Sequence, residues 1–229
     1  IGCTTAWFWS HIAAAYRRAW LGYPSATSRL SGPVAHDQDS SQAFQSWVRI
    51  RALPGKREHI VHVSSYQHMQ DLVARYLSAS ESVSIVDIGS YDVNGSYRTL
   101  FGNAGWSYSG IDLEAGPGVD IVLTSPYRLP FASDSVDLVI SGQAFEHVEF
   151  FWMTWLEMVR VLKPGGMIFL IAPSRGPEHR YPQDCWRFYP DGYRALAKYG
   201  HCELLEVTTD WEPHADPGSS DWGDTVGVF

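Results

Sequence analysis

Short apolar runs alternate along much of the chain with stretches whose apolar residues recur three and four positions apart. The runs have the length of strands buried on both faces. They predict strands at Val83–Ile88, Trp106–Asp112, Val119–Leu123, Val136–Ile140, Met167–Ala172, Cys202–Thr209 and Asp224–Phe229. Helical spacing predicts helices at His59–Ala79, Ser96–Asn103, Phe150–Leu162 and Gly192–Tyr199. Strands that alternate with helices indicate βαβ units and a doubly wound α/β domain with a mostly parallel sheet.

Residues 1–58 lack this alternation, so we expect an accessory or lid region there and the α/β domain at 59–229. Loosely helical spacing connects Trp7, Ile12, Tyr16 and Trp20, which predicts a helical N-terminal extension. The polar stretch that follows contains Gly32-Pro33, a signal for a loop. The aromatic residues of the extension suit internal packing, with a lid over a substrate pocket or a homodimer surface as alternatives.

The charge balance narrows the classes of partner. Seventeen Lys and Arg residues stand against twenty-five Asp and Glu, a formal net charge of −8. Binding a nucleic-acid backbone requires clustered cationic side chains, so we expect no nucleic-acid partner. No apolar run approaches the roughly 18 residues that span a bilayer, so no membrane partner is expected. Three widely spaced cysteines form no Cys-x-x-Cys pair, which favours the reducing cytoplasm over a disulfide framework or a zinc ribbon.

Two features at the ends of the first two predicted strands indicate a nucleotide site. The first strand runs into a turn containing Gly89 and Gly95, and glycines permit close approach of the backbone. Asp112 closes the second strand, where a carboxylate can accept hydrogen bonds from both hydroxyls of a ribose. A dinucleotide-binding turn requires Gly-x-Gly-x-x-Gly, but Tyr91 and Asp92 stand here instead. They suit a nucleoside joined to a sulfonium-bearing amino acid better than a pyrophosphate.

Five short motifs follow one another in order within residues 60–229. They are Val86-Asp87-Ile88-Gly89-Ser90, Gly110-Ile111-Asp112, Leu129-Pro130-Phe131 with Asp134-Ser135-Val136-Asp137, Glu146-His147-Val148, and Leu162-Lys163-Pro164-Gly165-Gly166. Together they resemble the class I S-adenosylmethionine-dependent methyltransferases, most closely the bacterial type 11 methyltransferase-domain group. The resemblance implies a Rossmann-like sheet of seven strands, mostly parallel with the last strand antiparallel, and S-adenosyl-L-methionine as the cofactor.

Carried over position by position, the resemblance implies a set of cofactor contacts. The methionine half would lie along the first turn and the end of the fourth strand, and the ribose would bind the acid that closes the second strand. The implied cofactor-binding residues are Asp87, Gly89, Ser90, Tyr91, Gly95, Asp112, Leu113, Ser125, Ser141, Gly142 and Gln143. The segment from Asp92 to Gly95 departs from the usual compact Gly-x-Gly. Relatives often carry an acid for the adenine amino group near Ser125, so adenine recognition would fall to this serine or to backbone atoms.

Residues for the methyl acceptor are expected after the fourth and fifth strands. Transfer needs the acceptor atom held in line, and a hydroxyl acceptor also benefits from a general base. Candidate bases are His147, His179 and Asp184, and candidate substrate-binding residues are Arg180, Trp186 and Arg187. The structural alternatives are that Glu146 and His147 only shape the pocket, and that the loop at 173–191 is held by its own ion pairs and aromatic packing.

These inferences predict methyl transfer from S-adenosylmethionine to a small molecule. The resemblance makes a hydroxyl of a sugar or of a glycosylated secondary metabolite the preferred acceptor. The alternatives are an N-methyltransferase, a non-catalytic S-adenosylmethionine-binding partner subunit and a nicotinamide-dependent oxidoreductase. No metal is expected, because His59, His62 and His68 are close in sequence but have no paired cysteine or carboxylate beside them.

Overall fold

The computed structural model describes residues 63–93, 95–215 and 217–229, which belong to one unit of the chain, residues 55–229. The predicted N-terminal extension at 1–58, together with His59 and His62, lies outside the described residues. Among the helices described, none has the length and apolar character that crossing a membrane requires.

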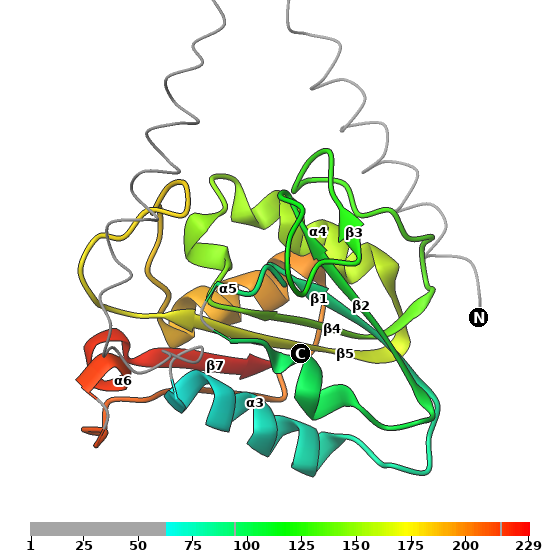
Figure 1. The fold of residues 1–229 in the computed structure, drawn as a ribbon, viewed down its shortest axis with the longest axis horizontal. Coiled ribbons are helices and arrows are strands. Elements are labelled where there is room, and N and C mark those ends of the chain that lie inside the picture. The colour runs from blue at the N-terminus through cyan, green and yellow to red at the C-terminus, as the bar shows by residue number, and fades with distance from the viewer. Residues whose placement is uncertain (1–62, 94, 216) are drawn as a thin grey trace, which may run out of the picture. The chain divides into compact units, whose positions relative to one another are not determined.

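Seven strands form one sheet in the order β3-β2-β1-β4-β5-β7-β6 (Figure 1). Their bounds are Val83–Ile88 (β1), Trp106–Asp112 (β2), Ile121–Val122 (β3), Val136–Gly142 (β4), Leu162–Pro173 (β5), Glu206–Thr209 (β6) and Asp224–Val228 (β7). Parallel pairing connects β3, β2, β1, β4 and β5, whereas β7 is antiparallel to both β5 and β6. The prediction of a seven-stranded, mostly parallel sheet with an antiparallel last strand is confirmed.

Helices cover both faces of this sheet. The described α-helices are Val63–Tyr76 (α3), Phe151–Val161 (α4), Pro190–Gly200 (α5) and Pro217–Trp222 (α6). Two short 3₁₀ helices span Tyr97–Phe101 (η1) and Phe145–His147 (η2). In Figure 1, α4 and α5 lie on one face of the sheet and α3 lies on the other. The architecture therefore has the three layers expected of a doubly wound domain.

The core follows from the two-residue period of the strands. Val86 packs in the cluster that contains Trp155 of α4 and Tyr193 of α5. Its neighbour Ile85 belongs to the opposite cluster, which contains Leu72 of α3. Successive side chains of a buried strand point to opposite faces, and fully burying each large apolar side chain contributes about 1.5–3 kcal/mol. The strand ends are therefore held in register by two independent apolar layers.

The start of β5 differs from the prediction. The sequence predicts that the Lys-Pro-Gly-Gly segment stops the helix and turns the chain before a strand begins at Met167. In the structure β5 begins directly after α4, and these four residues lie within the strand. Val136 is opposite Leu162 and Leu138 is opposite Met167, so the segment forms a bulge. Gly165 has a φ of +81° there, a conformation that glycine adopts without steric cost.

Candidate cofactor and acceptor site

The carboxyl ends of β1, β2 and β4 meet at one edge of the sheet. The chain runs from β1 toward β2 and β3 on one side, then crosses over to β4 on the other side. A doubly wound sheet binds its ligands at such a switch point, beyond the carboxyl ends of the strands. The turn beginning at Gly89, the acid Asp112 and the β4 residues Ser141 and Gly142 all lie at this edge.

Gly89 brings the first turn close to the segment that follows β4. Its φ is +83°, and a Cβ at this position would lie 2.4 Å from the Cβ of Ala144. The backbone N–H groups of Gly89 and Ser90 donate to the carbonyl oxygen of Ile111, over 3.0 and 3.2 Å. The Ser90 hydroxyl oxygen is buried and has no hydrogen-bond partner in the described part of the chain. The turn is therefore packed closely against its neighbours, and the Ser90 hydroxyl in it has no partner among the described residues.

Asp112 is in direct contact with this turn. Its Oδ2 accepts from the backbone N–H of Tyr91 over 3.2 Å. Its Oδ1 accepts from the N–H groups of Leu113 and Glu114, over 2.6 and 3.2 Å. A carboxylate has about four acceptor positions, so these bonds leave capacity for a hydroxyl donor. The glycine turn and the acid therefore adjoin each other, which is the arrangement that the nucleoside-site hypothesis requires.

Asp87 lies beneath the turn near the end of β1. It is buried, and burial raises the pKa of its carboxyl from the ordinary value of 3.8 to about 7. The Tyr108 hydroxyl donates to Asp87 Oδ2. The guanidinium of Arg98 lies 4.5 Å from the centre of the Tyr108 ring and favours the ionised carboxylate. A cation brought to this edge would stabilise the ionised carboxylate further.

The residues at the end of β4 serve largely to tie elements together. The Ser141 hydroxyl donates to the carbonyl oxygen of Ile88 over 3.0 Å, which joins β4 to β1. Gln143 has a φ of +57°, and its amide donates to Asp224 Oδ1 over 2.8 Å and to Ser65 Oγ over 3.2 Å. The Gln143 side chain thus joins β4 to β7 and α3.

The remaining predicted cofactor residues lie in loops around the same edge. The Gly95 N–H donates to Asp92 Oδ1 over 2.6 Å, which closes the second half of the first turn. Ser125 follows β3, and its hydroxyl accepts from the N–H of Tyr127 over 3.2 Å. Tyr91 and Leu113 are 36% and 48% exposed, so both keep apolar surface open to solvent.

His147 and His179 meet beside the segment that follows β4. Their ring centres are 4.7 Å apart, with the rings close to perpendicular. His147 Nδ1 is 2.5 Å from the carbonyl oxygen of Gln183, which fixes the orientation of the ring. Burial lowers the pKa of both imidazoles. The structure therefore brings together two neutral rings from segments 32 positions apart (179 − 147).

Asp184 and Arg187 form a buried ion pair behind His179. Arg187 donates two hydrogen bonds to the carboxylate, over 2.5 and 2.8 Å, and the Asp184 side chain is only 3% exposed. These bonds hold the pKa of the Asp184 carboxyl well below its usual range. Asp184 Oδ2 also accepts from the backbone N–H of His179 over 2.8 Å. Asp184 is thus a weak proton acceptor that is well placed to orient His179.

Arg180 and Trp186 lie toward the surface of the same loop. Arg180 pairs with Glu178 over 2.6 Å, and both side chains are mostly exposed. The indole N–H of Trp186 donates to the carbonyl oxygens of Val148 and Glu149, each over 3.1 Å. These contacts fix Trp186 on the segment that follows η2, whereas Arg180 remains at the exposed rim.

Glu146 is a candidate functional residue that the sequence reasoning credited only with shaping the pocket. The residue is 0% exposed, and neither carboxylate oxygen has a hydrogen-bond partner among the described residues. Burial raises the pKa of its carboxyl to about 8. His147 Nε2 lies 3.5 Å from Glu146 Oε1. The Glu-His pair was visible in the sequence, but no pattern revealed that the carboxylate is fully buried.

The comparisons with known proteins agree with this arrangement. Residues 86–170, from β1 to β5, match the family model described as "Methyltransferase domain". This match supports the resemblance of the chain to class I S-adenosylmethionine-dependent methyltransferases.

An uncharacterized methyltransferase of Mycobacterium tuberculosis (strain ATCC 25177 / H37Ra) is 34% identical over 132 residues, which cover 51% of this chain and 49% of the relative. The chain thus spans about half the length of this relative. An S-adenosylmethionine-dependent methyltransferase from Mesorhizobium loti superposes with a TM-score of 0.52 at 15% identity, covering 70% of this chain and 96% of that one. The [4+2]-cyclase SpnF gives 0.55 at 14% identity, covering 76% and 83%. These structures share the fold, which alone does not determine the reaction.

Proposed function

We propose that the described domain binds S-adenosylmethionine across the ends of β1, β2 and β4 and transfers its methyl group to a hydroxyl of a small molecule. The contact between Tyr91 N–H and Asp112 Oδ2 carries this proposal, because it joins the glycine turn to the acid in one site. The match of residues 86–170 to a methyltransferase domain supports it independently.

The residues at this edge fit the cofactor. Asp112 retains acceptor capacity for a ribose hydroxyl, and a second hydroxyl would displace one of its longer 3.2 Å bonds. The unpartnered hydroxyl of Ser90 offers a further hydrogen bond. The exposed faces of Tyr91 and Leu113 suit the adenine ring. Asp87 would become fully ionised beside a cationic ligand, because an adjacent positive charge lowers the pKa of a carboxyl.

On the acceptor side, the chain has to position an oxygen and dispose of its proton. S-adenosylmethionine supplies a methyl group on a positively charged sulfur, which departs as a thioether. As the C–O bond forms and the C–S bond breaks, the hydroxyl proton must leave the oxygen. His147 and His179 lie together after the end of β4, and because burial lowers the pKa of both imidazoles the rings are neutral at about pH 7. We therefore assign these two imidazole rings as the first candidates to accept the hydroxyl proton.

The surroundings of these histidines favour a polar acceptor with ring structure. Tyr181 lies 6.0 Å from His147 between ring centres, and Trp186 lies on the same loop. Aromatic faces with nearby polar groups suit sugars and glycosylated molecules, which the family resemblance also favours. We therefore propose a sugar hydroxyl as the acceptor.

Calorimetry on the full chain with S-adenosylhomocysteine tests the cofactor assignment. Asp112→Asn removes the charge that strengthens the ribose hydrogen bonds, so we expect at least a roughly tenfold loss of affinity. Glu114→Gln is the matched control, because it removes a carboxylate two positions away that is exposed. Its affinity should stay within about twofold of the parent. Unchanged affinity in Asp112→Asn, or binding of NAD in place of S-adenosylhomocysteine, would refute the site.

Release of S-adenosylhomocysteine from S-adenosylmethionine tests the transfer itself. The full chain is incubated with a panel of monosaccharides and glycosides, and the methylated product is identified by mass spectrometry. We expect an O-methylated sugar. A chain that binds the cofactor but methylates no member of the panel would contradict the sugar assignment, and amine acceptors assayed alongside would reveal an N-methyltransferase.

A further inference from the structure

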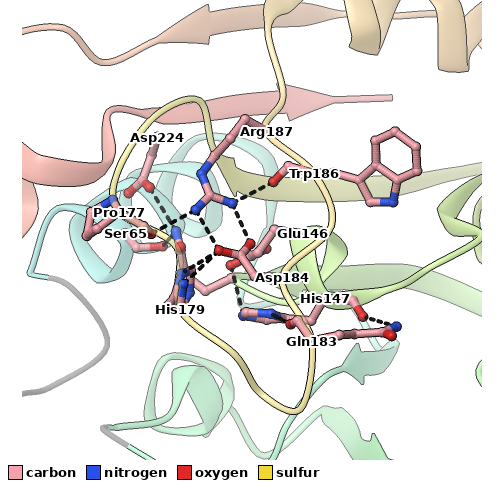
Figure 2. Close-up of polar contacts among 11 residues, drawn as sticks. Ser65, Glu146, His147, Pro177, His179, Gln183, Asp184, Trp186, Arg187 and Asp224 are labelled. Carbon is pink, nitrogen blue, oxygen red and sulfur yellow. Dashed lines mark hydrogen bonds and ion pairs between the residues drawn. The ribbon is translucent and has the colours of Figure 1, made fainter.

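Three potential metal ligands converge at the acceptor side of the site. Glu146 and His147 come from η2, and His179 comes from the loop after β5 (Figure 2). One ligand atom from each residue lies within 4.8 Å of the other two, and within the described residues this is the one such group. Four bonds in a tetrahedral zinc site place neighbouring ligand atoms roughly 3.3 Å apart, because the metal–nitrogen distance is about 2.0 Å. The 3.5 Å between Glu146 Oε1 and His147 Nε2 is already close to that value.

The Glu146 carboxylate is the observation that calls for a ligand. It is fully buried, and both oxygens lack hydrogen-bond partners in the described part of the chain. His147 is its one ion-pair partner there, and the nearby Arg187 is engaged by Asp184. A buried carboxylate without a cation is costly, and buried charges are normally paired or bound to metals. The fold therefore leaves the two oxygens of the Glu146 carboxylate without a partner, where they can bind a cation.

The His147 imidazole is oriented by the kind of partner that metal-binding histidines have, and a carboxylate lies beside the His179 imidazole. His147 Nδ1 faces the carbonyl oxygen of Gln183, which leaves Nε2 directed at Glu146. His179 Nδ1 lies 3.3 Å from the carboxylate of Asp184 but has no hydrogen-bond partner among the described residues, whereas the backbone N–H of His179 donates to that carboxylate over 2.8 Å. Such outer partners set the ring orientation and strengthen the ligand. The arrangement thus extends beyond three residues that merely lie close together.

We propose that Glu146, His147 and His179 form a binding site for a divalent transition-metal ion such as Zn²⁺. Two imidazoles and one carboxylate suit zinc and its first-row neighbours, whereas Mg²⁺ prefers oxygen ligands and retains its water. Three protein ligands leave a coordination position open, which is the pattern of catalytic rather than structural zinc. A contraction of the ligand set from its present separations completes the site when the ion binds.

The open position would take the acceptor, an inference that rests on the proposed function. A hydroxyl bound to a divalent ion loses its proton at lower pH than a free one. A bound ion would thus let the hydroxyl proton pass to solvent at lower pH, while the acceptor oxygen forms its bond to the methyl carbon and the C–S bond breaks. In this form of the site the imidazole lone pairs hold the ion, so the two histidines act as ligands rather than as bases.

Metal titration of the full chain tests the site directly. The protein is dialysed against a chelator and then titrated with Zn²⁺ and with Co²⁺, whose visible absorption reports the coordination geometry. We expect one ion per chain and a Co²⁺ spectrum typical of four or five ligands, with no competition from millimolar Mg²⁺. Glu146→Gln and His179→Ala each remove a ligand, and each should weaken binding by at least about 100-fold.

The matched control is His214→Ala. His214 and His68 both contact Asp210, over 2.7 and 2.9 Å, so this second group has the same composition but a carboxylate that is already partnered. Metal affinity should not change in His214→Ala. Loss of binding in this variant, retention in Glu146→Gln, or absence of stoichiometric binding by the parent would overturn the proposal.

Two further measurements separate the possible failures. Glu146→Gln replaces a buried carboxyl by an amide of nearly the same shape, so its thermal midpoint in chelator should stay close to that of the parent, which excludes unfolding as the cause of lost binding. Its affinity for S-adenosylhomocysteine should stay within about twofold, because Glu146 is not one of the residues assigned to the cofactor. If the parent binds the cofactor but no metal ion, only the metal site is refuted. If the parent does not bind the cofactor, the proposed function is refuted.

Discussion

Replacing Gly89 by alanine should destabilise the domain for two separable reasons. The first is the backbone, because a φ of +83° costs a non-glycine residue about 1–2 kcal/mol. The second is steric, because the new Cβ would lie 2.4 Å from the Cβ of Ala144. Forcing an extra methyl group into a packed site costs typically about 1–3 kcal/mol. Alanine also restricts the unfolded chain, which offsets about 0.4–1 kcal/mol, so we expect a net loss of about 1–4.5 kcal/mol.

Two companion variants divide this loss into its parts. Gly165 has nearly the same φ, +81°, but a Cβ there would meet nothing within 4 Å, so Gly165→Ala measures the backbone cost alone. Ala144→Gly removes the atom with which the new Cβ would collide. Combined with Gly89→Ala and compared with each single variant, it should recover about 1–3 kcal/mol as a coupling energy.

Urea unfolding followed by tryptophan fluorescence measures these free energies, with an unchanged denaturant slope as the sign that the two end states are the same. The order of stability should be the parent, then Gly165→Ala, then Gly89→Ala. If Gly89→Ala costs no more than Gly165→Ala, or if Ala144→Gly gives no recovery, the turn does not pack against the segment after β4 in the way described.

The remaining predictions concern the buried charges. Burial raises the pKa of Asp87 to about 7, so its contribution to stability is greatest below its ordinary pKa of 3.8 and is lost as the pH rises toward 7. Relative to Asp87→Asn, the cofactor-free parent should therefore lose ~2 kcal/mol of stability between about pH 5 and about pH 7 in urea titrations; parallel curves for the two proteins would contradict this. Arg187→Lys replaces a guanidinium that holds both oxygens of buried Asp184, so unfolding should become easier by about 1–3 kcal/mol. The control Arg194→Lys alters an exposed pair with Asp191 and should stay within about 0.5 kcal/mol, and equal effects in the two variants would show that the buried pair is not special.

The strands of the sheet could be predicted where they appear in the sequence as continuous apolar runs. The predicted bounds of β1 and β2 coincide with those observed, because a strand buried on both faces appears as one apolar run with a turn at its end. The helix α6, Pro217–Trp222, was missed because it is short and carries no apolar repeat. The Lys-Pro-Gly-Gly bulge was taken for a turn because the same residues suit both, and only the pairing of β4 with β5 decides between them.

The candidate site likewise has one part that the sequence predicts and another part that it does not. The glycine turn and Asp112 were predictable because each follows directly from the end of a strand, and the topology of a doubly wound sheet places those ends together. The environment of His179 was not predictable. It depends on the path of the long loop after β5, on the carbonyl oxygen of Gln183 beside His147 and on the ion pair of Asp184 with Arg187. None of these leaves a periodic trace in the sequence.

The place of β7 in the sheet bears on how the chain matures. β7 lies between β5 and β6 although it follows both in the sequence, so its two neighbours leave the ribosome before it does. Until β7 arrives, the long β5 strand exposes an open edge that could template pairing with foreign strands. A nascent chain therefore passes through a stage in which the edge of β5 is open to wrong pairing. This stage ends only when β7 inserts between β5 and β6, and it is the stage at which a chaperone would act.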